Sequence, residues 1–85
     1  MNTIYKYPIE ITDEQILSIP AAFDPLHVGL DPKGAPCLWC AVDNNRSKRD
    51  VKVAVVGTGN PIPQGVTLHV GSFVQGPFVW HVFLF

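Results

Sequence analysis

Four of the chain's six basic side chains stand within seven residues, at Arg46, Lys48, Arg49 and Lys52. Guanidinium groups bind phosphate oxygens in pairs, and an ammonium group adds a point charge, so such a cluster is a candidate anion clamp. The competing interpretation is a solvated loop. On the first interpretation, Arg46, Lys48 and Arg49 bind the phosphate of a small ligand.

A second candidate site is the segment Gly57-Thr58-Gly59-Asn60, which follows an apolar stretch. Glycine-rich backbone can turn its N–H groups toward an anion, which makes Thr58 and Asn60 candidate ligand-binding residues. A plain turn is the alternative. No helix signal follows, so the segment is neither a dinucleotide-binding motif nor a P-loop.

Histidines at positions 27, 69 and 81 stand in apolar surroundings with several aromatic residues available for stacking. Three imidazoles could ligate a metal, but no carboxylate stands beside any of them, and structural or interface roles are the more frequent outcome. We expect His69 and Trp80 to contact a ligand, and we expect no metal and no cofactor.

Two cysteines form a C-x-x-C spacing at Cys37 and Cys40. Their neighbours, Leu38, Trp39 and Ala41, indicate a buried strand, in which residues three apart face opposite sides. We therefore predict two reduced, buried thiols that share no metal. The chain also has no serine paired with a plausible histidine and acid, and we predict that it is not an enzyme.

The last third of the chain, from Val53 to Phe85, contains no Lys, Arg, Asp or Glu. Its closing segment alternates so that both faces carry apolar side chains, and an exposed apolar face usually marks an interaction site. We predict a homo-oligomer whose interface contains Val79, His81, Phe83 and Phe85.

With 85 residues, 47% of them hydrophobic and 15% charged, the chain is predicted to form a single domain over residues 1–85. The net charge of −1 argues against general binding of nucleic acid or acidic membranes. No basic, apolar leader opens the chain, and Gly, Pro and His interrupt its most apolar stretch, so we expect a cytoplasmic protein that does not enter the membrane.

Short apolar segments separated by turn formers predict an all-β fold, a small antiparallel β-sandwich or barrel of six to seven strands. The predicted strands are Thr3–Ile11, Ile16–Ile19, Leu26–Leu30, Pro36–Val42, Val51–Val56, Val66–Val74 and Phe78–Phe85. Residues 13–19 also fit one helical turn, because Thr12 to Gln15 resembles a capping box; we favour a strand there. Asp43–Asp50 is predicted to be a polar loop.

Strict alternation fixes the predicted faces of the last hairpin. In its first strand, Thr67, His69, Gly71 and Phe73 would share one side. In its second strand, Phe78, Trp80, Val82 and Leu84 would face one way, and the four predicted interface residues the other.

Several motifs resemble a small family of uncharacterised proteins encoded by tailed bacteriophages, prophages and their bacterial hosts. They are Ile4–Gln15, Leu26-His27-Val28, Pro36–Trp39, Val56–Pro63 and Phe78–Phe83. The resemblance covers nearly the whole chain and implies an accessory phage protein that acts in bacterial cytoplasm. It assigns no functional residues.

These observations favour a phage accessory protein that binds and sequesters a nucleotide-like immune signal of the host, without catalysis, as a homo-oligomer. One alternative is an inhibitor that docks its apolar C-terminal hairpin on a host defence protein. Another is a minor structural or assembly protein of the virion. The chain is similar to known counter-defence proteins only in its small size and its β-rich character.

Overall fold

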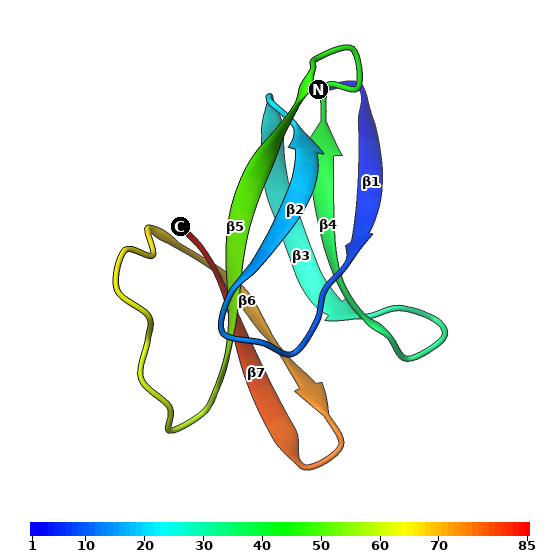
Figure 1. Ribbon diagram of the computed structural model, residues 1–85. Coiled ribbons are helices and arrows are strands. Elements are labelled where there is room, and N and C mark those ends of the chain that lie inside the picture. The colour runs from blue at the N-terminus through cyan, green and yellow to red at the C-terminus, as the bar shows by residue number, and fades with distance from the viewer.

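The computed structural model describes residues 1–85 and contains seven strands and no helix (Figure 1). The strands are β1 (Thr3–Pro8), β2 (Gln15–Pro20), β3 (Phe23–Leu30), β4 (Pro36–Val42), β5 (Lys48–Gly57), β6 (Leu68–Gln75) and β7 (Phe78–Leu84). The all-β prediction is confirmed, and residues 15–20 are a strand, as favoured from the sequence.

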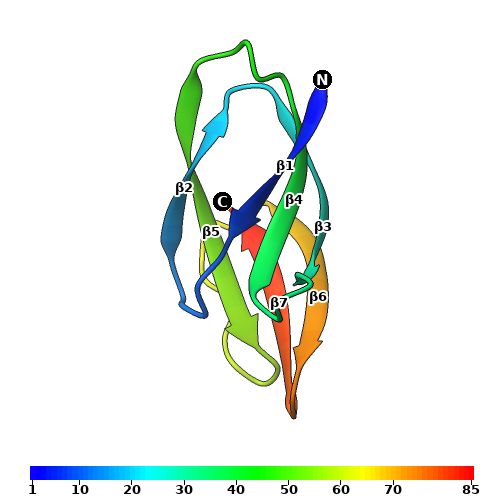
Figure 2. The ribbon, with the colours of Figure 1, turned by 90° about the vertical axis from the view of Figure 1, so that its right-hand side faces the viewer.

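Two antiparallel sheets form the fold, one in the order β1-β4-β3 and the other in the order β2-β5-β7-β6 (Figure 2). Their inner faces enclose a core in which Leu38, Val53 and Val82 are fully buried. The architecture is the predicted small antiparallel sandwich. Its interior is apolar, because no polar or charged residue is fully buried.

Proline positions explain why several strands lie at sheet edges. Pro8, Pro20 and Pro25 belong to β1, β2 and β3, and each of these strands pairs with only one neighbour. Proline has no N–H for a second ladder, so edge strands tolerate it. Pro8 therefore fits the place of β1 at the edge of its sheet.

The segment before β2 forms a bend rather than a helix because the Gln15 side chain closes it. The Gln15 amide accepts a hydrogen bond from the Glu10 N–H at 2.9 Å and donates one to the Glu10 carbonyl at 2.8 Å. This pair of bonds satisfies the backbone N–H and carbonyl of Glu10, where the chain passes from the first sheet to the second. The first strand therefore ends at Pro8, three residues earlier than predicted.

Asp31 organises the hairpin turn between β3 and β4. Its carboxylate accepts bonds from the N–H groups of Lys33 and Ala35, both at 2.9 Å, and pairs with Lys6 at 3.0 Å. Gly34 has a φ of 82°, a left-handed conformation that glycine adopts at little cost. The N–H bonds and Lys6 lower the pKa of Asp31 to about 2.

Three predicted strand starts are wrong: β3 begins at Phe23 rather than Leu26, β6 at Leu68 rather than Val66, and β5 at Lys48 rather than Val51. Lys48, Arg49 and Asp50 were assigned to a polar loop, but they begin β5 and pair with residues 18–20 of β2. All three side chains are exposed, so they give no apolar signal. Backbone pairing with β2, rather than burial of side chains, extends β5 here.

The predicted alternation in β6 is also wrong, because the strand contains a β-bulge. His69 pairs with Phe83 while Gly71 pairs with Val82, which leaves Val70 as the extra residue. Phe73 is buried in the core, and a Cβ on Gly71 would lie 3.1 Å from Val28, so this side faces inward. His69 therefore lies on the opposite, outer face.

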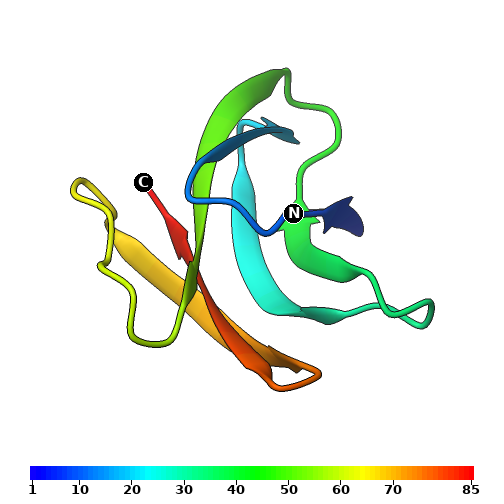
Figure 3. The ribbon, with the colours of Figure 1, turned by 60° about the horizontal axis from the view of Figure 1, so that its bottom comes forward.

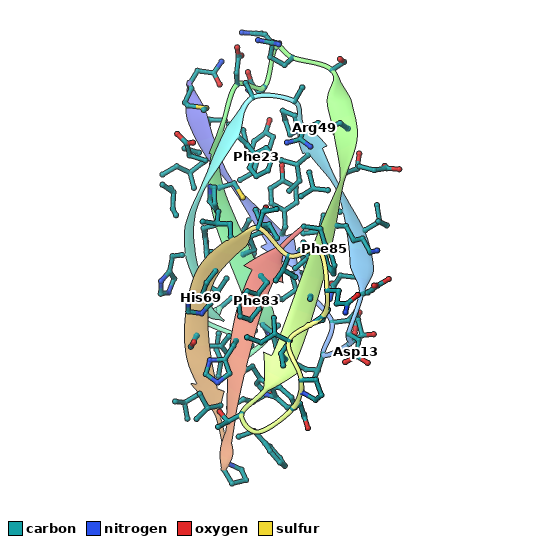
Figure 4. The ribbon with its side chains drawn as sticks, turned by 90° about the vertical axis from the view of Figure 1, so that its left-hand side faces the viewer. Asp13, Phe23, Arg49, His69, Phe83 and Phe85 are labelled. Atoms are coloured by element: carbon teal, nitrogen blue, oxygen red, sulfur yellow. The ribbon has the colours of Figure 1, made fainter.

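A long loop, residues 58–67, joins β5 to β6 and passes over the outer face of the four-stranded sheet (Figures 3 and 4). Ala54 and Val56 point to that face, yet they are only 0% and 5% exposed. The 58–67 loop thus covers part of the surface formed by the charge-free residues 53–85. The outward-facing apolar residues of β5 need no second protein to shield them.

Candidate histidine pocket

A cavity of about 300 Å³ lies between the 58–67 loop and the outer face of β6 and β7. His69, His81 and Phe83 form the wall contributed by the two strands, and Figure 4 shows His69 beside Phe83. The loop side is formed by Gly57, Thr58, Gly59, Asn60 and Ile62, with Val56 at the base. We call this cavity the histidine pocket.

A hydrogen-bonded chain of four side chains runs across this region. Thr58 Oγ1 lies 2.7 Å from Nε2 of His81, and Ser72 Oγ lies 2.6 Å from its Nδ1. Ser72 Oγ also lies 3.3 Å from Nε2 of His69. The bulge in β6 makes this possible, since it turns His69 to the face that carries Ser72.

The hydroxyl of Thr58 has one hydrogen and two partners, so the direction of these bonds follows from where that hydrogen points. When it points to the Val79 carbonyl, 3.5 Å away, Thr58 accepts from Nε2–H of His81. Nδ1 of His81 is then the bare nitrogen and accepts from the Ser72 hydroxyl. Ser72 Oγ in turn accepts from Nε2–H of His69.

The glycine segment forms a β-turn rather than an open ring of donors. Asn60 N–H bonds to the Gly57 carbonyl at 3.0 Å, and Thr58 N–H bonds to the Val79 carbonyl at 3.2 Å. Gly59, with a φ of 93°, occupies the position where a type II turn requires positive φ. The N–H groups of Thr58 and Asn60 are thus already used within the protein, so side chains must supply most of the polar contacts to a ligand.

Trp80 lies on the other side of the same turn. Its half-buried ring packs against the core and stacks on Phe78, with ring centroids 5.6 Å apart. Its Nε1 donates to the Gln75 side chain at 3.3 Å. A second cavity, of about 400 Å³, is lined by Trp80 together with Thr58 and Asn60. The turn thus separates a histidine cavity from an aromatic one.

The basic cluster lies at the other end of β5. Arg49 pairs with Ile19 at the start of the strand, whereas Val56, seven residues on, is level with His81. At about 3.3 Å per residue the two levels are about 23 Å apart. Figure 4 shows Arg49 beside Phe23, away from His69. Within one protomer, Arg46, Lys48 and Arg49 do not meet the histidine pocket.

Two of these cations already have aromatic partners. The Arg49 guanidinium lies 5.1 Å from the centre of the Phe23 ring, and the Lys52 ammonium lies 4.5 Å from that of Phe85. Lys52 also pairs with Glu14 at 3.2 Å. These contacts fix the two side chains at a groove of about 380 Å³ on the edge of the sandwich.

The predicted interface residues all lie on the outer face of β7, as the alternation of that strand indicated. Val79 is 38% exposed, whereas His81, Phe83 and Phe85 are half-buried because the 58–67 loop and Lys52 cover part of them. The larger exposed apolar surface is at the hairpin tip, where Val74 is 62% and Phe78 57% exposed.

The two cysteines are free and buried, and they face opposite sides of β4. Cys40 belongs to the core, where burial raises the pKa of its thiol to about 11. Cys37 lies on the outer side, with its sulfur 3.8 Å from an Asp31 oxygen, and burial raises its pKa as well. Nowhere in the chain do three or more His, Cys, Asp or Glu side chains gather at one point.

The sequence did not single out Ser72, although its hydroxyl contacts two histidines. A Ser three residues after a His in a strand gives no signal of contact, because strict alternation puts the two on opposite faces. Only the bulge brings them together, and its one signal in the sequence is Gly71, a glycine inside the strand.

Residues 1–84 match the family described as "Domain of unknown function (DUF7352)". The chain belongs to this family. Neither the curated proteins nor the solved structures contain a match to this chain. The DUF7352 assignment confirms that the chain is a member of an uncharacterised family, and it gives no activity. The structure contains no helix that is long and apolar enough to cross a membrane.

Proposed function

We propose that this DUF7352 protein is a non-enzymatic binding protein that holds a small nucleotide-like ligand in the histidine pocket. The main support for this proposal is the set of hydrogen bonds from Thr58 through His81 and Ser72 to His69. These side chains lie beside a cavity of about 300 Å³. Ligand sites typically combine apolar walls with a few fixed polar groups, at volumes of roughly 300–1,000 Å³.

The pocket offers the contacts that a nucleobase needs. The rings of His69 and Phe83 lie 5.0 Å apart and form an aromatic wall. Stacking of a base on such a wall contributes about 1–3 kcal/mol. The exposed side chain of Asn60 has both donors and an acceptor for the polar edge of a base. Thr58, Asn60 and His69 therefore remain the proposed ligand contacts.

The proposed setting is that of a phage accessory protein in the cytoplasm of its host, where it would sequester an immune signal as a homo-oligomer. The resemblance to phage-encoded proteins supports the setting, and the exposed apolar side chains of the β6–β7 hairpin support self-association. In such an oligomer Arg46, Lys48 and Arg49 can contribute only to the pocket of a second copy.

The test is extraction of the bound molecule. Protein purified from phage-infected bacteria is denatured, and the released small molecules are identified by mass spectrometry. The proposal expects a nucleotide derivative from the wild type and none from Asn60→Ala, with His27→Ala as the matched control. Release of the same molecules from both variants, or of no nucleotide at all, contradicts it.

A second candidate is an inhibitor that binds a host protein through the hairpin tip. The exposure of Val74 and Phe78, 62% and 57%, favours it. In that case the purified wild type retains a host protein in a fixed ratio, and Phe78→Glu releases it. The histidine pocket would then be dispensable for the effect on the host.

A further inference from the structure

Two imidazole nitrogens converge on one point of the outer sheet face. Nε2 of His69 lies 3.3 Å and Nδ1 of His81 lies 2.6 Å from the same atom, Ser72 Oγ. The histidines come from neighbouring strands, with ring centroids 6.4 Å apart. Paired strands hold them from two sides, so the convergence is a property of the sheet and not of a flexible loop.

One of these nitrogens has a partner that can prepare it to coordinate a cation. When Thr58 accepts from Nε2–H of His81, 2.7 Å away, Nδ1 of His81 carries the lone pair. Metal-binding histidines commonly donate their other ring N–H to a fixed acceptor, which sets the tautomer and orients the ring. Thr58 supplies that acceptor here when its own hydroxyl hydrogen points to the Val79 carbonyl, 3.5 Å away.

The histidine pocket also lacks a positively charged side chain that could neutralise the phosphate of a nucleotide. None of its nine lining residues is Lys, Arg, Asp or Glu. The basic cluster begins β5, about 23 Å away along the strand. A phosphate bound in this pocket would therefore face only neutral groups unless a cation accompanies it.

We infer that His69 and His81 hold one divalent transition-metal ion, of the class that prefers imidazole (Zn²⁺, Ni²⁺ or Cu²⁺), and that this ion binds the ligand's phosphate. The role of the ion toward the ligand rests on the proposed function, whereas the metal site itself does not.

The geometry needs only a local adjustment. Zn–N bonds are about 2.0–2.1 Å long, shorter than the present distances to Ser72 Oγ. Ser72 and His69 are exposed, so both can rotate until the ion replaces the Ser72 hydroxyl as the point of convergence. To bind the ion through Nε2, His69 must carry its ring hydrogen on Nδ1. No third His, Cys, Asp or Glu joins the pair. The ion keeps open positions, which phosphate oxygens can fill.

The first test titrates the metal-free protein with Zn²⁺ or Ni²⁺ alone by calorimetry. One ion per chain is expected, with affinity at least about tenfold weaker in His69→Ala and in His81→Ala. His27→Ala is the matched control, since His27 lies on the other sheet beside Trp39. Absence of saturable binding, or equal weakening by His27→Ala, overturns the inference. His69 is exposed, so its variant tests the site even if His81→Ala misfolds.

The second test adds ADP-ribose and a panel of cyclic nucleotides with and without a metal chelator. Binding that needs the ion supports the inference. Binding that is unchanged by the chelator overturns the role of the ion while the proposed function stands. If metal binds at His69 and His81 and no nucleotide binds in either condition, the site stands, and its role toward a nucleotide falls together with the proposed function.

Discussion

The Ser72 hydroxyl lies 2.6 Å from Nδ1 of His81, although the two residues belong to different strands. They are direct cross-strand partners in the ladder between β6 and β7. The bond joins two strand side chains on an outer sheet face, and Thr58 extends it to the loop above. A polar chain therefore crosses an otherwise apolar surface, and this makes the surface a candidate site.

The first prediction concerns the tautomer of His81. We expect Thr58 to donate to the Val79 carbonyl, in which case neutral His81 carries its hydrogen on Nε2 and bonds to the Thr58 oxygen. Long-range ¹H–¹⁵N correlation spectra at a pH where the ring is neutral should show this tautomer. In Thr58→Val the preference should disappear. A wild-type spectrum showing the hydrogen on Nδ1 would mean that the hydrogen bonds from Thr58 to His69 run in the opposite direction.

A second prediction concerns self-association. Val79→Glu places a charge on the outer face of β7, and burying an unpaired charge in a dry interface is strongly unfavourable. Light scattering after size exclusion should show an oligomer for the wild type and a smaller species for Val79→Glu. Ile4→Glu, on the outer face of the other sheet and 59% exposed in the monomer, is the control and should leave the mass unchanged. A monomeric wild type at micromolar concentration contradicts the oligomer.

The third prediction is a dependence of stability on acid. The pKa of Asp31 is lowered from 3.8 to about 2 in the folded chain, so its stabilising contribution is complete above pH 3.8 and is lost as the pH falls through 2. Asp31→Asn should lower the free energy of unfolding at pH 7. The difference from wild type should shrink between pH 4 and pH 2. A difference independent of pH over that range would show that the charge is not the cause.

The fourth prediction concerns the hydroxyl of Tyr7, which is buried without a hydrogen-bond partner. An unsatisfied buried polar group costs about 1–3 kcal/mol. Tyr7→Phe removes the group and keeps the ring, so the free energy of unfolding should rise by up to that amount. Denaturant titration measures it, with Tyr5→Phe as the control. A loss of stability in Tyr7→Phe alone would mean that the hydroxyl has a partner in solution.

The fold was predictable because short apolar segments and turn formers act locally. Gly34 and Asp31 mark a hairpin by their chemistry, and Pro8 marks an edge strand because it lacks a donor. The boundary at Lys48 was not predictable in the same way. Its assignment to β5 depends on pairing with β2, a distant segment.

The candidate site was predictable only in part. Thr58, Asn60 and His69 were expected to bind a ligand, and the structure brings them to one cavity. The basic cluster was expected to join them, but the length of β5 separates the two groups. Ser72 carried no signal, because its contact with His69 depends on the extra residue at Val70.

The measurement that tests the central claim most directly is calorimetric titration of the protein with ADP-ribose and a panel of cyclic nucleotides. The account predicts saturable binding of at least one of them, weakened about tenfold or more in His69→Ala and unchanged in His27→Ala. No binding of any member in the presence of Zn²⁺, or equal affinity of wild type and His69→Ala, would contradict the claim that the histidine pocket binds a nucleotide-like ligand.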